Sequence, residues 1–188
     1  MRAFDLLLLV VLSGCAHQHE PSIRYLARSE LKPSGTAVGA QHRLLATRAD
    51  GSKEYALVLA KGDEVMTALN DFASREQLGA ASFTAIGAVR SAEVGWFDFG
   101  KRKYKAMRRD EQLEVLSLVG DIGMGSDDKP VVHAHVTLGR ESGRTFGGHL
   151  IAATVSPTLE VFVTGYPQAM KKRLDVTDDV ELFQLATP

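Results

Sequence analysis

The alternation of apolar and polar side chains predicts that strands dominate the second half of the chain. Short apolar or period-two runs, bounded by turn-forming residues, occupy seven segments: 82–89, 92–99, 104–108, 113–119, 131–138, 145–153 and 159–164. The breaks between them fall at Gly100, Asp110, Gly120 to Lys129 and Gly143. A closing strand is predicted over 180–185, where apolar residues again alternate with polar ones.

The first half of the chain predicts a hairpin followed by a helix. Residues 41–47 and 54–59 flank Asp50-Gly51, a common hairpin turn. Asp63 is placed to cap a helix that ends by Gly79, with apolar residues at three- and four-residue spacings: Val65, Met66, Leu69, Phe72 and Ala73. A second helix is expected over 167–174. The predicted fold class is α+β, with a central, mostly antiparallel β-sheet and one main covering helix.

Composition is that of one globular domain with no global bias towards nucleic acid. The 188 residues are 45% hydrophobic and 24% charged, with a formal net charge of −1. Cations gather locally between Lys101 and Arg109, and we interpret this cluster as a solvated strand or loop face. We expect the folded domain to span 39–188.

The N-terminus carries a pattern typical of an export signal. Arg2 precedes an uncharged run over 6–12, which is shorter than the roughly 20 apolar residues of a membrane-spanning helix. The run ends in Leu12-Ser13-Gly14-Cys15, which resembles the lipobox of bacterial lipoproteins. Residues 1–15 are therefore expected to be a signal ending at Cys15, the only cysteine, which would be lipidated.

A lipidated Cys15 predicts a protein held at the periplasmic side of a bacterial membrane. Residues 16–38 are polar and contain prolines and glycine, so we expect a flexible tether there. His17 and His19 lie in this segment, and we interpret them as solvated side chains and not as metal ligands.

Three histidines near the centre of the predicted sheet are candidate metal ligands. His133 and His135 are separated by one residue, so in a strand they point to the same face with Cβ atoms about 7 Å apart. His149 follows two glycines, which allow close backbone approach or a bend beside a site. Zinc often uses three such ligands and keeps one position open for water. The spacing alone leaves open whether these residues bind metal or are satisfied structural histidines.

Three carboxylates interrupt apolar runs and are candidates to assist a metal. Glu114 is the candidate catalytic residue, because a carboxylate can orient a ligand imidazole or act as a general base. Glu93 and Glu160 are further candidates, although alternation also permits an outward strand position for all three.

Several motifs in order resemble the PPC domain, the plant and prokaryote conserved domain, over residues 41–185. They are Gly62 to Val65, Ala85 to Val89, Leu113 to Gly120, His133 to Leu138 and Gly147 to Leu150. The resemblance implies an α+β fold, a homotrimer and, as in many prokaryotic members, zinc held by His133, His135 and His149. The fold is also similar to that of acetolactate decarboxylase, which uses three histidines to hold zinc.

The resemblance leaves the function open between two classes. One is a zinc-binding trimer that binds or acts on a small metal-chelating molecule, and the other is a non-enzymatic binding or assembly module with structural zinc. DNA binding is a common family label, because plant members carry AT-hook segments. This sequence has no Arg-Gly-Arg-Pro-like hook, so we do not expect nucleic acid as a partner.

Overall fold

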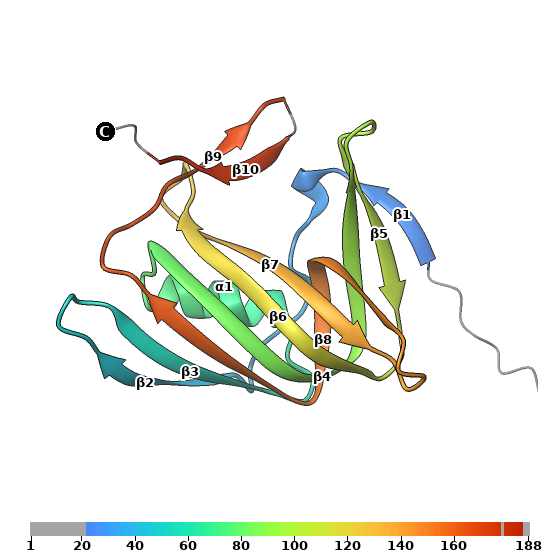
Figure 1. Ribbon diagram of the computed structural model, residues 1–188, viewed down its shortest axis with the longest axis horizontal. Coiled ribbons are helices and arrows are strands. Elements are labelled where there is room, and N and C mark those ends of the chain that lie inside the picture. Colours follow the sequence, from blue (N-terminus) through green and yellow to red (C-terminus); the bar gives the residue numbers. More distant parts are fainter. Residues whose placement is uncertain (1–21, 178, 186–188) are drawn as a thin grey trace, which may run out of the picture.

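One α-helix lies against a strongly curved β-sheet in the described part of the chain (Figure 1). The computed structural model describes residues 22–177 and 179–185, so the predicted signal, Cys15, His17 and His19 lie outside the described residues. The helix α1 spans Val65–Arg75 and a short 3-10 helix η1 spans Arg28–Glu30. The strands are β1 Ser22–Leu26, β2 Gln41–Thr47, β3 Lys53–Ala60, β4 Ala80–Asp98, β5 Lys103–Arg109, β6 Leu113–Met124, β7 Pro130–Gly139, β8 Thr145–Gly165, β9 Lys172–Asp175 and β10 Val180–Phe183. The predicted α+β class is confirmed.

The main sheet closes on itself. Its order is β1-β5-β4-β6-β7-β8-β3-β2, and β4 also pairs with β8, so the four strands β4, β6, β7 and β8 form a ring. The pairs that build this ring are antiparallel. Apolar side chains of all four strands meet on the inner face, including Val94, Leu118, Val136 and Leu150. The ring sets the positions of β7 and β8, which carry the candidate histidines.

Two long bent strands replace four predicted short ones. The predicted strands 82–89 and 92–99 fall, apart from Phe99, in the single strand β4, and 145–153 and 159–164 belong to β8. Register shifts between Gly87 and Ser91 bend β4 without ending it. Gly87 has a φ of 150°, and a Cβ there would overlap the carbonyl oxygen of Thr158. Gly87 lies inside the predicted strand 82–89, and together with the register shifts it allows one continuous strand to join two parts of the sheet.

The predicted hairpin and first helix are confirmed, with a different capping residue. β2 pairs with β3, and α1 buries Met66, Leu69 and Phe72. Glu64 and not Asp63 is the N-cap, since its carboxylate accepts hydrogen bonds from the backbone of Met66 and Thr67. The Asp63 carboxylate instead accepts from the backbone N–H groups of Gly39 and Ala60, at 2.9 Å each, and fixes the preceding loop.

Both ends of the described chain contradict the sequence prediction. No helix forms over 167–174; β9 pairs there with β10, which confirms a strand within 180–185. The backbone N–H of Met170 donates to Gly79 and its carbonyl accepts from Met124, which holds this segment extended. Within the predicted tether 16–38, β1 pairs with β5 because Leu26 is buried beside Ala106 and Ile151. Among the described residues, no helix has the length and apolar character needed to cross a membrane.

Candidate metal centre

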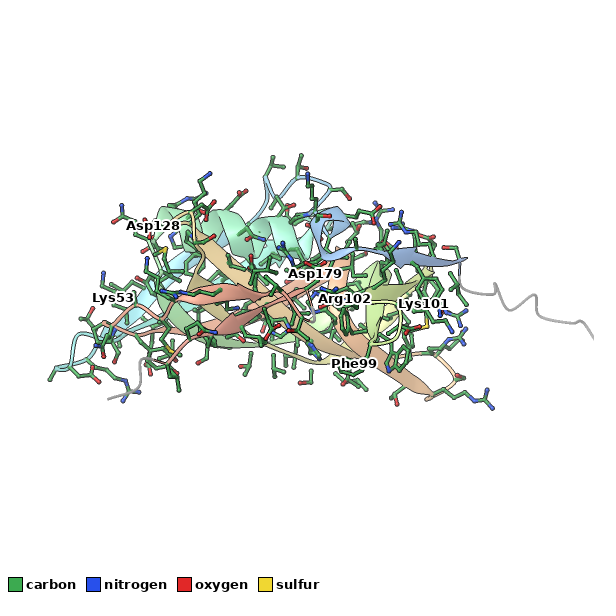
Figure 2. All side chains as sticks on the ribbon, turned by 90° about the horizontal axis from the view of Figure 1, so that it is seen from above. Lys53, Phe99, Lys101, Arg102, Asp128 and Asp179 are labelled. Atoms are coloured by element: carbon green, nitrogen blue, oxygen red, sulfur yellow. The ribbon has the colours of Figure 1, made fainter. Side chains whose placement is uncertain are left out.

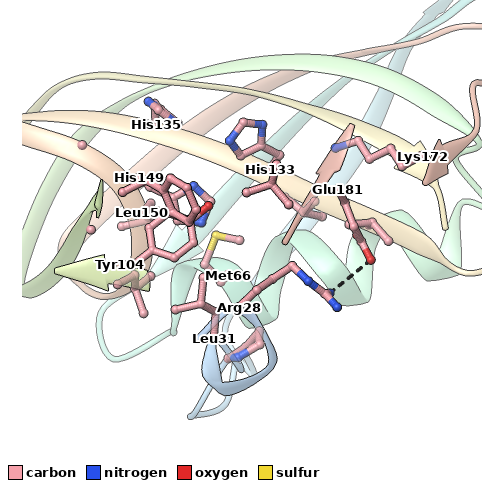
Figure 3. Close-up of a pocket in the computed structure, with 18 of the residues that line it drawn as sticks. Arg28, Leu31, Met66, Tyr104, His133, His135, His149, Leu150, Lys172 and Glu181 are labelled. Atoms are coloured by element: carbon pink, nitrogen blue, oxygen red, sulfur yellow. Dashed lines mark hydrogen bonds and ion pairs between the residues drawn. The ribbon is translucent and has the colours of Figure 1, made fainter. Parts of the chain in front are cut away.

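Three histidines from two neighbouring strands converge on one point. His135 of β7 is paired with His149 of β8, and His133 lies two residues away on the same face of β7. One ring nitrogen of each lies within 4.8 Å of the others. The ring centroids are 5.0 to 5.6 Å apart, and the rings gather beside Tyr104 and Lys172 in Figure 3. The predicted convergence of these side chains is confirmed.

The two glycines before His149 allow the close contact between β8 and its neighbours. A Cβ at Gly147 would overlap the carbonyl oxygen of Val136 on β7. At Gly148, where φ is 154°, a Cβ would lie 2.6 Å from the carbonyl oxygen of Gly95 on β4. Side chains at these two positions would push β8 away from β7 and β4. The glycines therefore bring His149 within reach of His133 and His135.

The environment keeps two of the imidazoles neutral. Burial, together with the nearby His133 and His135, lowers the pKa of His149 to about 3. Burial and His133 also lower the pKa of His135. A lowered histidine pKa means that the neutral ring, which is the form that binds metal, persists at lower pH than usual. The neutral rings of His135 and His149 can therefore act as metal ligands.

Asp121 and Lys172 form a charged pair behind His133. Asp121 of β6 is paired with His133 in the ladder, and its Oδ2 lies 3.4 Å from His133 Nδ1. Lys172 Nζ forms an ion pair with Asp121 Oδ1. Burial raises the pKa of Asp121, but the hydrogen bonds and charges of His133 and Lys172 outweigh it, so the net pKa is lowered. The ionised carboxylate can therefore hold His133 Nδ1–H and leave Nε2 free for a ligand.

The donor set fits a zinc ion. Tetrahedral zinc at about 2.1 Å from each imidazole places ligand nitrogens about 3.4 Å apart, so modest ring rotations would suffice from the observed spacing. His149 Nδ1 is buried and has no hydrogen-bond partner within the described part of the chain. A coordinated cation would satisfy this atom. Neutral imidazoles without thiolates suit zinc and related divalent transition metals.

A pocket opens directly onto the histidines. It has a volume of about 670 Å³ and includes His133, His135 and His149 in its lining. Most of the remaining lining is apolar or aromatic, including Trp96, Phe97, Val131, Leu150 and Leu182. A small molecule can therefore reach the cluster from this side.

Comparisons with known proteins agree with this architecture. The sequence model of the Plants and Prokaryotes Conserved (PCC) domain matches residues 46–167. The protein belongs to the PCC domain family. This is the plant and prokaryote conserved (PPC) domain family expected from the sequence motifs, so that prediction is confirmed. No protein with a curated description matches the chain.

Solved structures of similar proteins carry two kinds of description. A metal-containing protein from Archaeoglobus fulgidus is 36% identical, with a TM-score of 0.65 over 71% of this chain and 94% of that one. A proposed DNA-binding protein from Ralstonia eutropha is 30% identical, with a TM-score of 0.65 over 74% of this chain and 94% of that one. A plant- and prokaryote-conserved protein from Pyrococcus horikoshii is 26% identical, with a TM-score of 0.67 over 79% and 97%. The fold of this PCC domain is thus shared with archaeal and bacterial proteins.

The carboxylates proposed from the sequence do not join the histidines. Glu114 is exposed on β6 and is paired with Gly139, seven positions from Asp121, which corresponds to about 23 Å along a strand. Within one chain, Glu114 therefore lies away from the three histidines. Glu93 is buried and forms an ion pair with Arg24 through two hydrogen bonds. Glu160 is exposed on β8. Asp121, which the sequence analysis missed, is the carboxylate beside the cluster.

The basic segment of this PCC domain is partly neutralised by its surroundings. Lys101 pairs with Asp98 at 3.0 Å, and Arg108 pairs with Asp110. Arg102 donates to the backbone carbonyl of Val176 at 2.6 Å. Figure 2 shows Arg102, Phe99 and Lys101 to the right of Asp179, which lies near the middle of that view. These contacts agree with a solvated, locally paired face.

We predict that Asp121→Asn weakens zinc binding by about 10- to 100-fold, the usual effect of losing an outer partner of a ligand histidine. The matched control is Glu114→Gln on the same strand, which should leave zinc affinity unchanged. Competition titration against a chelator of known affinity measures both, and circular dichroism checks that both variants are folded. Equal affinities for the two variants would contradict the role of Asp121.

Proposed function

We propose that this PCC domain binds one zinc ion through His133, His135 and His149 and uses the open side of that ion to bind a small metal-chelating molecule. The observation that carries the proposal is the three-histidine cluster opening into a pocket of about 670 Å³. Zinc held by three neutral imidazoles supplies a Lewis acid and a site for water or an oxygen ligand. Whether a reaction follows binding depends on the ligand.

The open side of the cluster favours ligand binding over a purely structural role. Structural zinc sites have four protein ligands and no open position. Among the described residues, the group that could hold a metal consists of these three histidines. The alternative, an assembly module with structural zinc, would require a fourth ligand from outside the described residues or from another copy. The Archaeoglobus fulgidus relative, described as metal-containing, also supports a metal-binding role.

We do not propose DNA as the ligand, although the Ralstonia eutropha relative carries that description. The chain has a formal net charge of −1, whereas affinity for duplex DNA depends on several free cations that contact phosphates. Lys101 and Arg108 are already paired with acidic side chains.

We predict that the purified protein contains about one zinc ion per chain and that the double variant His133→Ala, His135→Ala contains almost none. The reason is that one remaining imidazole cannot hold zinc against solvent. The control is His42→Ala, because His42 lies outside the cluster and its Nε2 contacts Glu76 at 3.0 Å. Elemental analysis after purification without chelators gives the stoichiometry. Metal-free wild-type protein that takes up no zinc on addition would contradict the proposal.

We also propose that the domain assembles as a homotrimer through the outer face of its sheet. Exposed apolar side chains gather there in neighbouring strands, and Ile86 and Phe162 are 61% and 56% exposed. Phe162, Thr84, Val119 and His135 are successive partners across β8, β4, β6 and β7. The apolar face is therefore continuous with the histidine cluster, and patches of this kind commonly mark interfaces.

We predict that Phe162→Asp reduces the particle mass from three chains to one, because a carboxylate at the centre of an apolar interface would be buried without a partner. Multi-angle light scattering after gel filtration measures the mass. Val38→Asp, at a highly exposed apolar residue of the loop before β2, is the control and should remain trimeric. A wild-type protein with the mass of one chain would contradict the proposed homotrimer.

Finally, we propose that Cys15 is acylated and holds the domain at the periplasmic side of a membrane. The support is the sequence Leu12-Ser13-Gly14-Cys15 and the lack of any other cysteine. Expression in a bacterium with lipoprotein-processing enzymes should give membrane-bound protein that begins at a lipid-modified Cys15, and Cys15→Ala should be released or remain unprocessed. Intact-mass measurement decides this. An unmodified Met1 in cytosolic protein would exclude it.

A further inference from the structure

The two ends of the described chain form part of the pocket wall. Arg28 and Leu31 come from the N-terminal segment, and Lys172 and Leu182 from the β9–β10 hairpin. All four lie outside residues 46–167, which match the family model. Figure 3 shows Arg28 and Leu31 on one side of the pocket and Lys172 and Glu181 on another. This part of the wall thus comes from segments outside the residues that match the family model.

The N-terminal segment and the β9–β10 hairpin contact each other and the rest of the domain. Arg28 Nη1 lies 3.3 Å from Glu181 Oε1, and Arg28 Nε lies 3.5 Å from Asp179 Oδ1. On the domain side, Arg102 holds the hairpin turn through the carbonyl of Val176. These contacts keep the apolar side chains of both segments over the pocket.

A row of aromatic rings runs from the histidines to the pocket rim. The distance between ring centroids is 4.8 Å for Tyr104 and His149, 5.0 Å for Phe97 and Tyr104, and 5.3 Å for Phe99 and Phe97. Phe99 and Trp96 also line the pocket and are 74% and 60% exposed. Exposed aromatic side chains beside a cavity provide stacking surface for a planar apolar group.

Several of the polar side chains in the wall already have partners. Arg28 is paired with Glu181 and Asp179, and Lys172 is paired with Asp121. Asn70 Nδ2 donates to the backbone carbonyl of Met66 at 2.7 Å. The polar head of a ligand therefore finds its best position at the histidine cluster, where a zinc ion with neutral ligands would retain its full positive charge.

We infer that the pocket binds molecules in which a metal-chelating oxygen head, such as a 2-hydroxy or 2-oxo carboxylate, is joined to an aromatic body. The head coordinates at the three histidines and the body lies against Tyr104, Phe97 and Trp96 beneath Leu31 and Leu182. This inference rests on the proposed metal site. The volume of about 670 Å³ is within the range of small-molecule sites and exceeds what a three-carbon hydroxy acid fills.

Mandelate and lactate test the inference, because they share the 2-hydroxy carboxylate head and differ by a phenyl ring in place of a methyl group. Isothermal titration calorimetry on the zinc-loaded full chain should give a Kd for mandelate at least about tenfold lower than for lactate, the effect expected from partial burial of a ring. Chelator-treated, metal-free protein should bind mandelate much more weakly. Mandelate should also change the fluorescence of Trp96, the only tryptophan in the sequence.

Two neighbouring leucines of the hairpin give a matched pair of variants. Leu182 and Leu174 are 45% and 44% exposed, and only Leu182 is part of the pocket lining. Leu182→Ala should raise the Kd of mandelate by about fivefold, from the loss of roughly one contacting isobutyl group, and leave that of lactate unchanged. Leu174→Ala should change neither. Zinc content is measured for every variant.

The outcomes separate this inference from the proposed function. Zinc-loaded protein that binds the two acids within twofold of each other, or that responds equally to both leucine changes, would overturn the aromatic-body inference and leave the metal site intact. Mandelate affinity that is the same with and without zinc would show that the head does not coordinate, which also overturns it. A protein that takes up no zinc would overturn both proposals.

Discussion

The register of β7 against its two neighbours decides which side chains make up the candidate metal centre. On one side it places Asp121 of β6 beside His133, and on the other it places His149 of β8 beside His135. A shift by one residue would turn His133 and His135 towards the core and bring Ala134 and Val136 to the surface. Ala134, Val136 and Leu138 are buried in the core, so the apolar alternation of β7 stabilises the one register in which the histidines meet.

That register depends in turn on the closure of the sheet. β8 can pair with β7 through its first residues only because the rest of the strand continues alongside β4 and β3. The strands bend at glycines, which have no side chain, and at register shifts, and these bends permit the closure of the sheet. Gly87 accommodates Thr158, and Gly147 and Gly148 accommodate Val136 and Gly95. The glycines of this chain thus have a direct effect on the distance between His149 and its partners.

The sequence predicts those features that are encoded locally. Alternation placed His133 and His135 on one face, the Asp50-Gly51 turn predicted the first hairpin, and the spacing from Val65 to Ala73 predicted α1. Asp121 was missed because it lies beside His133 only through the pairing of β6 with β7. No local sequence pattern predicts the register of that pairing. The exposed position of Glu114, away from the histidines of its own chain, was not predictable, because an acidic residue in an apolar run gives the same pattern on either face and at either end of a strand.

The prediction for the chain ends failed for a related reason. Polar residues with prolines resemble a tether, but Leu26 finds a buried position beside Ala106, and Arg24 pairs with the buried Glu93. Likewise, segment 167–174 has few apolar residues, and its sequence is compatible with either a helix or an extended chain. The backbone hydrogen bonds of Met170 with Gly79 and Met124 select the extended form. Such tertiary contacts override weak local preferences.

Lys172 connects the candidate metal centre with the part of the chain outside the family match. Its side chain is 3% exposed and would carry an uncompensated buried charge without Asp121. In the same way, a half-buried Asp121 would lose a partner for its negative charge if the hairpin moved away. Since Asp121 also contacts His133, the position of the hairpin and the orientation of this histidine are energetically linked. A ligand that contacts Leu182 on this hairpin would therefore stabilise the arrangement that holds His133 in place.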